Sequence, residues 1–185
     1  MKKIGILAFL SITWCAEVMG QPEGGDQKIS KKQQRKEARA EKLVEIEQMV
    51  HDRSLILQAT SLQNRYGARS FTLDNNNYIL IDGERFVLQT SNPLYAGLNG
   101  VGGVTAVGSI STFEVIQDEK RKAISVIAQV NTPTLGQGTL TLQLNGSDFE
   151  RATFSSVWGV VVTFIGPVST LEDALVFEGF DRFGI

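Results

Sequence analysis

The sequence predicts a mainly β protein, in which an antiparallel meander forms a sandwich or a barrel-like sheet behind one N-terminal charged amphipathic helix. Three observations predict this class. From Leu55 onward, apolar and polar residues alternate with a period of two. The dipeptide Asp82-Gly83 separates two apolar runs, as in a β-hairpin. The later connections are short, so each strand is expected to pair with its neighbour in sequence.

Length and composition favour a single domain. The chain has 185 residues, of which 42% are hydrophobic, and this is enough for one ordinary core. We expect residues 1–20 to be a signal peptide, residues 21–40 to be a charged linker or a frayed helix, and residues 41–185 to be one β-rich domain. The formal net charge of -2 gives no reason to expect nucleic acid as a partner.

The first residues are typical of an export signal, because Met1-Lys2-Lys3 precedes a short apolar core. That core is about half as long as a membrane-spanning helix. Cys15 leaves a lipid anchor as the alternative, but the bulky Trp14 precedes it where a lipoprotein signal has a small residue. We therefore expect a periplasmic protein, and a membrane partner only if Cys15 is lipidated. Without Cys15 the mature chain has no thiol.

Residues 28–52 are predicted to form the helix. Leu43, Ile46, Met49 and Val50 recur at helical spacing and indicate a buried stripe. The first half lacks such a stripe and is basic, and its cations could contact an anionic lipid surface. The favoured interpretation is a solvated linker. These cations are Lys28, Lys31, Lys32, Arg35, Lys36 and Arg39.

The strands are predicted from alternation and from turn residues. The pair Asp82-Gly83 is expected to occupy a type I′ turn, and residues 94–107 are expected to be a glycine-rich connection. The densest apolar run outside the N-terminus, residues 156–168, is expected to be a buried central strand that closes the meander. A capping-box pattern predicts a short helix over residues 170–174. The predicted strands are residues 55–59, 70–73, 78–81, 85–90, 109–117, 124–131, 139–145 and 149–155.

The order of these segments resembles a family of exported proteins from gut-dwelling Gram-negative bacteria, classified as a domain of unknown function. The resemblance covers about residues 41–168. The split Pro-Leu-Tyr and the extension after Val168 depart from the family pattern. No activity is assigned to the family, so the resemblance implies none. The matching positions are Leu43-Val44, Asp82-Gly83, residues 93–97 (Pro-Leu-Tyr-Ala-Gly), residues 108–110 (Gly-Ser-Ile) and residues 164–166 (Phe-Ile-Gly).

No residue pattern predicts catalysis, a cofactor or a metal site. His51 is the one histidine, and we expect it to be solvated or to cap the helix. The Asn-rich loop at residues 74–77 is expected to be a turn rather than a calcium site, and residues 97–108 lack the Lys-Ser/Thr ending of a phosphate-binding loop. Paired carboxylates are expected to serve turns rather than glycoside hydrolysis; they are Asp82 with Glu84, Asp118 with Glu119, Asp148 with Glu150, and Glu172 with Asp173.

We therefore expect an exported cell-envelope protein with a structural or interaction role, which is not an enzyme. One alternative is a binding protein for a small or extended ligand in a sheet-lined cleft, with Tyr95, Phe113 and Trp158 near its opening. These aromatic residues are otherwise expected to belong to the core. A small outer-membrane β-barrel is a second alternative, which the charged helix and the terminal Ile185 disfavour.

Overall fold

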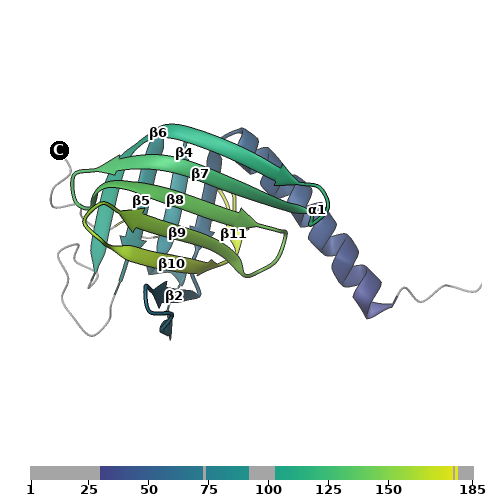
Figure 1. Ribbon diagram of the computed structural model, residues 1–185. Coiled ribbons are helices and arrows are strands. Elements are labelled where there is room, and N and C mark those ends of the chain that lie inside the picture. Colours follow the sequence, from purple (N-terminus) through teal and green to yellow (C-terminus); the bar gives the residue numbers. More distant parts are fainter. Residues whose placement is uncertain (1–29, 73, 92–102, 177, 179–185) are drawn as a thin grey trace, which may run out of the picture.

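The structure, a computed structural model, describes residues 30–72, 74–91, 103–176 and 178 (Figure 1). Within these residues the chain is mainly β, as predicted, with one α-helix before the strands. A short 3-10 helix, Asp74–Asn76, precedes the fourth strand. The elements are α1 Lys31–His51, β1 Ser54–Gln58, β2 Ser61–Asn64, β3 Arg69–Phe71, β4 Tyr78–Asp82, β5 Arg85–Thr90, β6 Val104–Asp118, β7 Ala123–Thr132, β8 Gly136–Leu144, β9 Glu150–Ser156, β10 Val161–Gly166 and β11 Val168–Ser169.

The strands form one antiparallel sheet in the order β11-β1-β4-β5-β6-β7-β8-β9-β10-β2-β3. From β4 to β10 each strand pairs with the next one in sequence, which confirms the meander. The consecutive strands β1 and β2 also pair with the last strands, because Leu57 lies opposite Val168 and Leu62 opposite Phe164. The amide of Gln58 donates to the carbonyl of Pro167 between these pairs, at 3.1 Å. The curled sheet is therefore barrel-like (Figure 1).

The inner face of the sheet carries a continuous cluster of buried apolar side chains. In β8, Leu140, Leu142 and Leu144 are buried, while the intervening Thr141 and Gln143 face outward. This alternation follows from the two-residue period of a strand. The rings of Phe86 and Phe154 stack with their centroids 5.9 Å apart. Side chains from both halves of the sheet thus fill the described interior.

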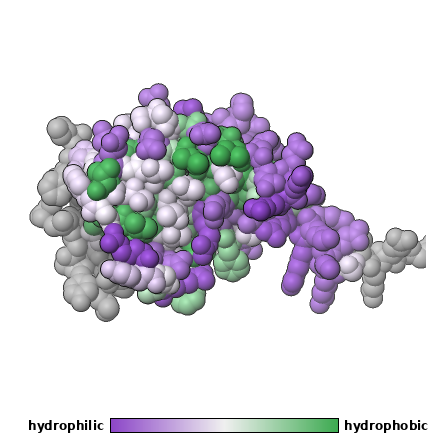
Figure 2. All heavy atoms as spheres, viewed as in Figure 1, coloured by the Kyte–Doolittle hydropathy of each residue, from purple (hydrophilic) through white to green (hydrophobic). Residues whose placement is uncertain are grey.

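Helix α1 closes one part of this core. Ser30 caps its start, because the Ser30 hydroxyl accepts from the Gln33 amide at 3.3 Å. Ile46 and Val50 belong to the core cluster, whereas every residue from 31 to 41 is exposed. The helix begins at Lys31, so its first turns lie in the stretch assigned to a linker or a frayed helix. This part projects beyond the sheet and is hydrophilic over its visible surface (Figures 1 and 2).

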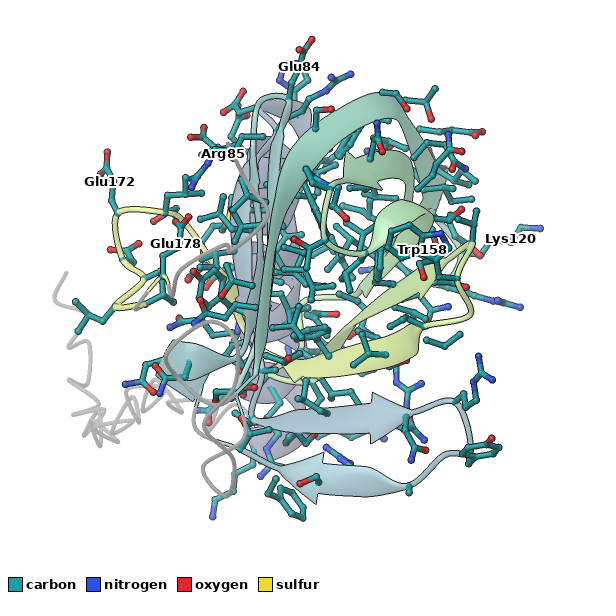
Figure 3. All side chains as sticks on the ribbon, turned by 90° about the vertical axis from the view of Figure 1, so that its left-hand side faces the viewer. Glu84, Arg85, Lys120, Trp158, Glu172 and Glu178 are labelled. Carbon is teal, nitrogen blue, oxygen red and sulfur yellow. The ribbon has the colours of Figure 1, made fainter. Side chains whose placement is uncertain are left out.

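Residues 170–176, the C-terminal segment, cover the outer face of β1, β4 and β5. Glu178, beyond this segment, forms an ion pair with Arg85, whose Nη2 lies 2.8 Å from Oε1 of the carboxylate (Figure 3). The predicted helix over residues 170–174 is wrong: the Thr170 hydroxyl accepts from the Asp173 amide, but only a turn forms. Leu171, Ala174 and Val176 of the segment pack against the second apolar cluster, which consists of Ile56, Tyr78, Leu80 and Val87.

The run at residues 156–168 is not one buried strand. β9 ends at Ser156 and β10 begins at Val161, and residues 157–160 turn the chain between them. Gly159, at φ 80°, supplies the left-handed conformation that this turn needs. Trp158 is 66% exposed because it lies on the turn. Hydrophobicity alone did not reveal that a glycine divides the run into two strands.

Two further predictions need correction. Asp82 pairs with Arg85, so Gly83 and Glu84 are the central residues of the hairpin turn. Gly83 has φ 60° and Glu84 is not left-handed, which matches a type II′ turn rather than type I′. The strand β6 begins at Val104, inside the predicted connection, because residues 104–107 pair with β5. Residues 94–102 of that connection lie outside the described residues.

Candidate anion-binding site

A groove lined mainly by cations lies where α1 meets two turns of the sheet. Its volume is about 320 Å³, and we call it the basic pocket. Four of its seven lining residues are cations and none is a carboxylate. It is lined by Lys36, Arg39, Ala40 and Leu43 of α1, by Arg121 and Lys122 of the β6–β7 turn, and by Asn145 of the β8–β9 turn.

The helix presents its part of the pocket on a single face. Lys36, Arg39 and Leu43 follow one another at intervals of three and four residues, which places them in one row. Leu43 packs against the core cluster and thereby fixes the rotation of the helix. Lys36 and Arg39 then lie along the same row, farther from the core.

Arg39 joins the helix to the β8–β9 turn. Its Nε donates to the carbonyl of Asn145 at 2.9 Å, and its Nη2 donates to Oδ1 of the same residue. The helix backbone also lies directly on Gly146, because a Cβ at that position would be 2.2 Å from the carbonyl oxygen of Arg39. Only a glycine at position 146 of the turn leaves room for the helix backbone.

The buried carboxylate of Glu150 fixes the conformation of this turn. Glu150 is fully buried, and it accepts from the amides of Asn145 at 2.8 Å and Ser147 at 2.6 Å. Burial raises the pKa of Glu150, while these backbone hydrogen bonds and the nearby charge of Arg39 act in the opposite direction. Glu150 thus holds the turn on which Arg39 rests.

The β6–β7 turn supplies the other two cations. Oδ1 of Asp118 accepts from the amide of Arg121 at 3.0 Å, and its second oxygen lies 3.6 Å from the guanidinium Nε. Lys122 has φ 52° and directly precedes β7. Within the described part of the chain, Lys36 and Lys122 have no carboxylate partner. The pocket therefore carries positive charge that the protein itself does not compensate.

A larger groove of about 860 Å³ lies between α1 and the C-terminal segment, and it is acidic. Two of its four carboxylates, Asp52 and Asp173, have local partners. Asp52 accepts from Gln48 at 2.7 Å and contacts the exposed His51 at 3.1 Å, and both contacts lower the pKa of Asp52. Asp173 bonds to the Thr170 hydroxyl at 2.6 Å. Among the residues that the structure describes, no group of His, Cys, Asp and Glu side chains is arranged to hold a metal ion.

The structure does not bring Phe113 and Trp158 together. Phe113 is half-buried against the core, and the guanidinium carbon of Arg53 lies 4.8 Å from its ring centre. Trp158 lies over Gly136 at the start of β8, so that a Cβ on this glycine would be 2.9 Å from the indole. Tyr95 lies outside the described residues.

Arg121, Lys122 and Asn145 were not predicted as site residues from the sequence. The run Lys120-Arg121-Lys122 is a visible signal, since it places three cations directly after Asp118-Glu119. No sequence pattern, however, indicates that this turn lies beside the basic half of the helix. Only the packing of α1 against the ends of the strands does so.

Comparisons with known proteins identify a shared fold. No protein-family model matches the chain, and no curated protein matches it. Among solved structures, it is similar to the crystal structure of a DUF4251 family protein from Bacteroides eggerthii DSM 20697, with a TM-score of 0.57 and 24% sequence identity. The match covers 72% of this chain and 90% of that one. In the described residues, no helix has the length and apolar character needed to cross a membrane.

Proposed function

We propose that the protein is an exported, non-catalytic interaction protein of the bacterial cell envelope, related to the DUF4251 family, that binds an anionic lipid surface through its basic pocket. The observation that carries this proposal is the convergence of four cations, without a carboxylate, from the helix and the β6–β7 turn. Phosphate groups are the natural complement of such a cluster, because arginine offers a planar fork of donors and lysine a compact charge.

The projecting helix extends the same positive surface. Lys32 lies four residues before Lys36, so it continues the row that leads through Arg39 to Leu43. These side chains are exposed up to Arg39. Each lysine or arginine near an anionic lipid surface contributes about 1 kcal/mol to binding. A row of cations ending in a pocket therefore favours a lipid surface over an isolated ion.

The described groups with shifted pKa values support a non-catalytic role. Asp52 bonds to the last turn of α1, Tyr78 lies beneath the C-terminal segment, and Glu150 holds the β8–β9 turn. The three groups do not share a groove, since Asp52 alone lines the acidic one, whereas catalytic groups with shifted pKa values gather in one cleft. Export to the cell envelope is supported by the signal-like residues 1–20.

Vesicle co-sedimentation tests the proposal. We expect the protein to sediment with vesicles that contain phosphatidylglycerol and to stay in solution with pure phosphatidylcholine. The double variant Lys36→Gln/Lys122→Gln should lose most of this binding, because it removes the two unpaired cations of the pocket. The control Arg69→Gln/Arg151→Gln removes the same charge from another face and should keep it. Equal losses in both variants would contradict a specific pocket.

A second arm separates the lipid from a soluble anion. Glycerol phosphate should not raise the melting temperature of the protein at concentrations at which vesicles bind it. Stabilisation by glycerol phosphate without vesicle binding would assign the pocket to a soluble phosphate ester instead, since a ligand of the folded state raises stability by mass action.

A further inference from the structure

The hairpin formed by β2 and β3 leaves one edge of the sheet open. β3 is the last strand in the sheet order and pairs only with β2 among the described strands. All three of its residues are exposed. The hairpin lies at the foot of the molecule, with β3 on its outer side (Figures 1 and 3). We call the outer side of β3 the open edge.

The hydrogen-bond pattern shows which backbone groups face outward. The amide of Asn64 donates to Ala68, and the amide of Thr72 donates to Thr60, each at 3.0 Å. Hydrogen-bonded pairs alternate in an antiparallel ladder, so Ser70 bonds toward β2. The N–H and C=O groups of Arg69 and Phe71 therefore point away from β2. They offer two donors and two acceptors to a further strand, and the Phe71 carbonyl also accepts from the Ser70 hydroxyl at 3.5 Å.

The side chains leave this edge uncovered. Arginine and lysine often protect the edges of sheets, but here Nε of Arg69 donates to the Ser61 hydroxyl at 2.8 Å, which draws the guanidinium across β2. Phe71 is 81% exposed and Tyr66, at the tip of the hairpin, 84%. Exposed aromatic residues beside arginine are typical of the energetic centres of protein interfaces.

The surrounding charge has one sign. Arg65 donates to the carbonyl of Gly159, and Arg151 donates to Gln63 at 3.5 Å. Neither they nor Arg69 has a carboxylate partner in the described part of the chain. Residues 59–72 and 151–171, which form this surface, contain no aspartate or glutamate. An acidic partner would supply the missing charge.

The two faces of the hairpin differ in chemical character, and this difference predicts which residues should alternate in a bound strand. Arg69, Phe71 and Arg151 share one face, because Phe71 lies opposite Ser61, Ser61 opposite Ile165, and Ile165 opposite Arg151. A depression of about 310 Å³ lies beside β10, and its lining includes Leu62, Ala68 and Val162 on the opposite face as well as Arg69. Side chains of an added strand alternate between the faces. Acidic side chains on one side of the added strand would contact the arginines. Apolar side chains on its other side would contact the depression.

We infer that the open edge binds an extended segment of another protein in which acidic and apolar residues alternate, as an additional strand of the sheet. Backbone hydrogen bonds to Arg69 and Phe71 supply affinity, and the two faces supply specificity, as in other cases of strand addition. This site lies apart from the basic pocket and does not depend on the proposed function.

The test uses the full chain and a synthetic probe, a fluorescent ten-residue peptide of alternating glutamate and valine. We expect its anisotropy to rise on binding and the affinity to fall with salt. The matched peptide of alternating lysine and valine should not bind. Equal affinity for the two peptides, or no binding of the glutamate peptide, would overturn the inference.

Two variants separate the backbone from the side chain. Phe71→Pro removes an outward N–H without breaking a bond to β2, so it should weaken binding by about tenfold or more. Phe71→Thr keeps that N–H and should weaken binding less. Circular dichroism and melting temperature show whether each variant is folded. Unchanged affinity in folded Phe71→Pro would rule out strand addition.

Charge reversal gives a readout that misfolding cannot imitate. Arg69→Glu should bind the lysine peptide in preference to the glutamate peptide. Analytical ultracentrifugation of the free protein completes the design, and we expect a monomer. A dimer that Phe71→Pro dissociates would assign the open edge to a second copy of the chain and overturn the inference.

Discussion

At the scale of single residues, two buried polar groups have opposite surroundings. The Glu150 carboxylate accepts two backbone hydrogen bonds, whereas the buried Tyr78 hydroxyl has no partner among the described residues. Burial raises the pKa of both groups, and the charge of Glu178 raises that of Tyr78 further. Tyr78 therefore stays neutral at physiological pH. Glu150 is the group whose titration couples to stability.

We predict that Glu150 makes stability depend on pH. Its pKa is higher in the folded state than its ordinary value of 4.5, so the folded state binds the proton more tightly. Its contribution to the free energy of unfolding is therefore complete below pH 4.5 and is lost as pH rises through the folded-state pKa, by about 1.4 kcal/mol for each unit of the shift. Urea unfolding of the wild type and Glu150→Gln across this range measures the difference. An advantage of the wild type that grows with pH would contradict the prediction.

At the scale of elements, the docking of α1 depends on two different kinds of contact. Ile46 and Val50 bury apolar surface in the core, whereas Arg39 and Gly146 bring the helix backbone against the β8–β9 turn. An ion pair between Lys42 and Asp148, at 2.8 Å, strengthens the second contact. The apolar contact holds the helix on the sheet, and the turn contact sets the position of the basic pocket.

Gly146→Ala should disturb this second contact. Gly83→Ala is a matched control, because Gly83 also has a positive φ but has nothing within 4 Å of an added Cβ. The control should lose about 1–2 kcal/mol to backbone strain. Gly146→Ala should lose about 1–3 kcal/mol more, because its Cβ would overlap the Arg39 carbonyl. Denaturant unfolding measures both losses, and equal losses would show that the helix does not rest on Gly146.

At the scale of the whole molecule, helix and sheet share one core. Ile46 of α1 belongs to the same cluster as Phe86 and Phe154 of the sheet. A helix that contributes to the core of the strands does not form a separate folding unit. Loss of its buried side chains therefore destabilises the sheet as well.

We predict that Ile46→Ala shifts the unfolding of helix and sheet together. It should cost about 2–5 kcal/mol, because it leaves a cavity in the core. Val44→Ala is the control on the same helix, since Val44 is 66% exposed, and it should change stability by less than about 0.5 kcal/mol. Far-UV circular dichroism follows the helix, and Trp158 fluorescence in a Trp14→Phe background follows the sheet. Separate midpoints for the two probes would contradict a shared core.

The fold could be predicted wherever a local pattern also decides the packing. Leu140, Leu142 and Leu144 alternate in sequence and are buried together, and the hairpin around Gly83 follows from its turn residues. The turn at Gly159 was missed because valines on both sides of it suggested one strand. The preference of Gly159 for a turn outweighed the tendency of the apolar run to form one strand.

The candidate site was less predictable, because its residues come together only through tertiary packing. The basic half of α1 was evident in the sequence, but its counterpart Arg121-Lys122 is distant in the chain. The open edge of β3 depends on which strand ends the sheet, and strand order is not a local property. Charge and exposure at both sites thus follow from topology rather than from motifs.

The pairing of the first strands with the last also constrains how the protein folds. Ile56 of β1 lies opposite Ser169 of β11, so this contact forms between chain segments that are far apart in sequence. Such contacts slow folding, because a long loop must close before they contribute. Until β10 and β11 dock, β1 and β9 have unpaired edges that can associate with other chains. The late closure of the sheet is therefore the step at which aggregation competes with folding.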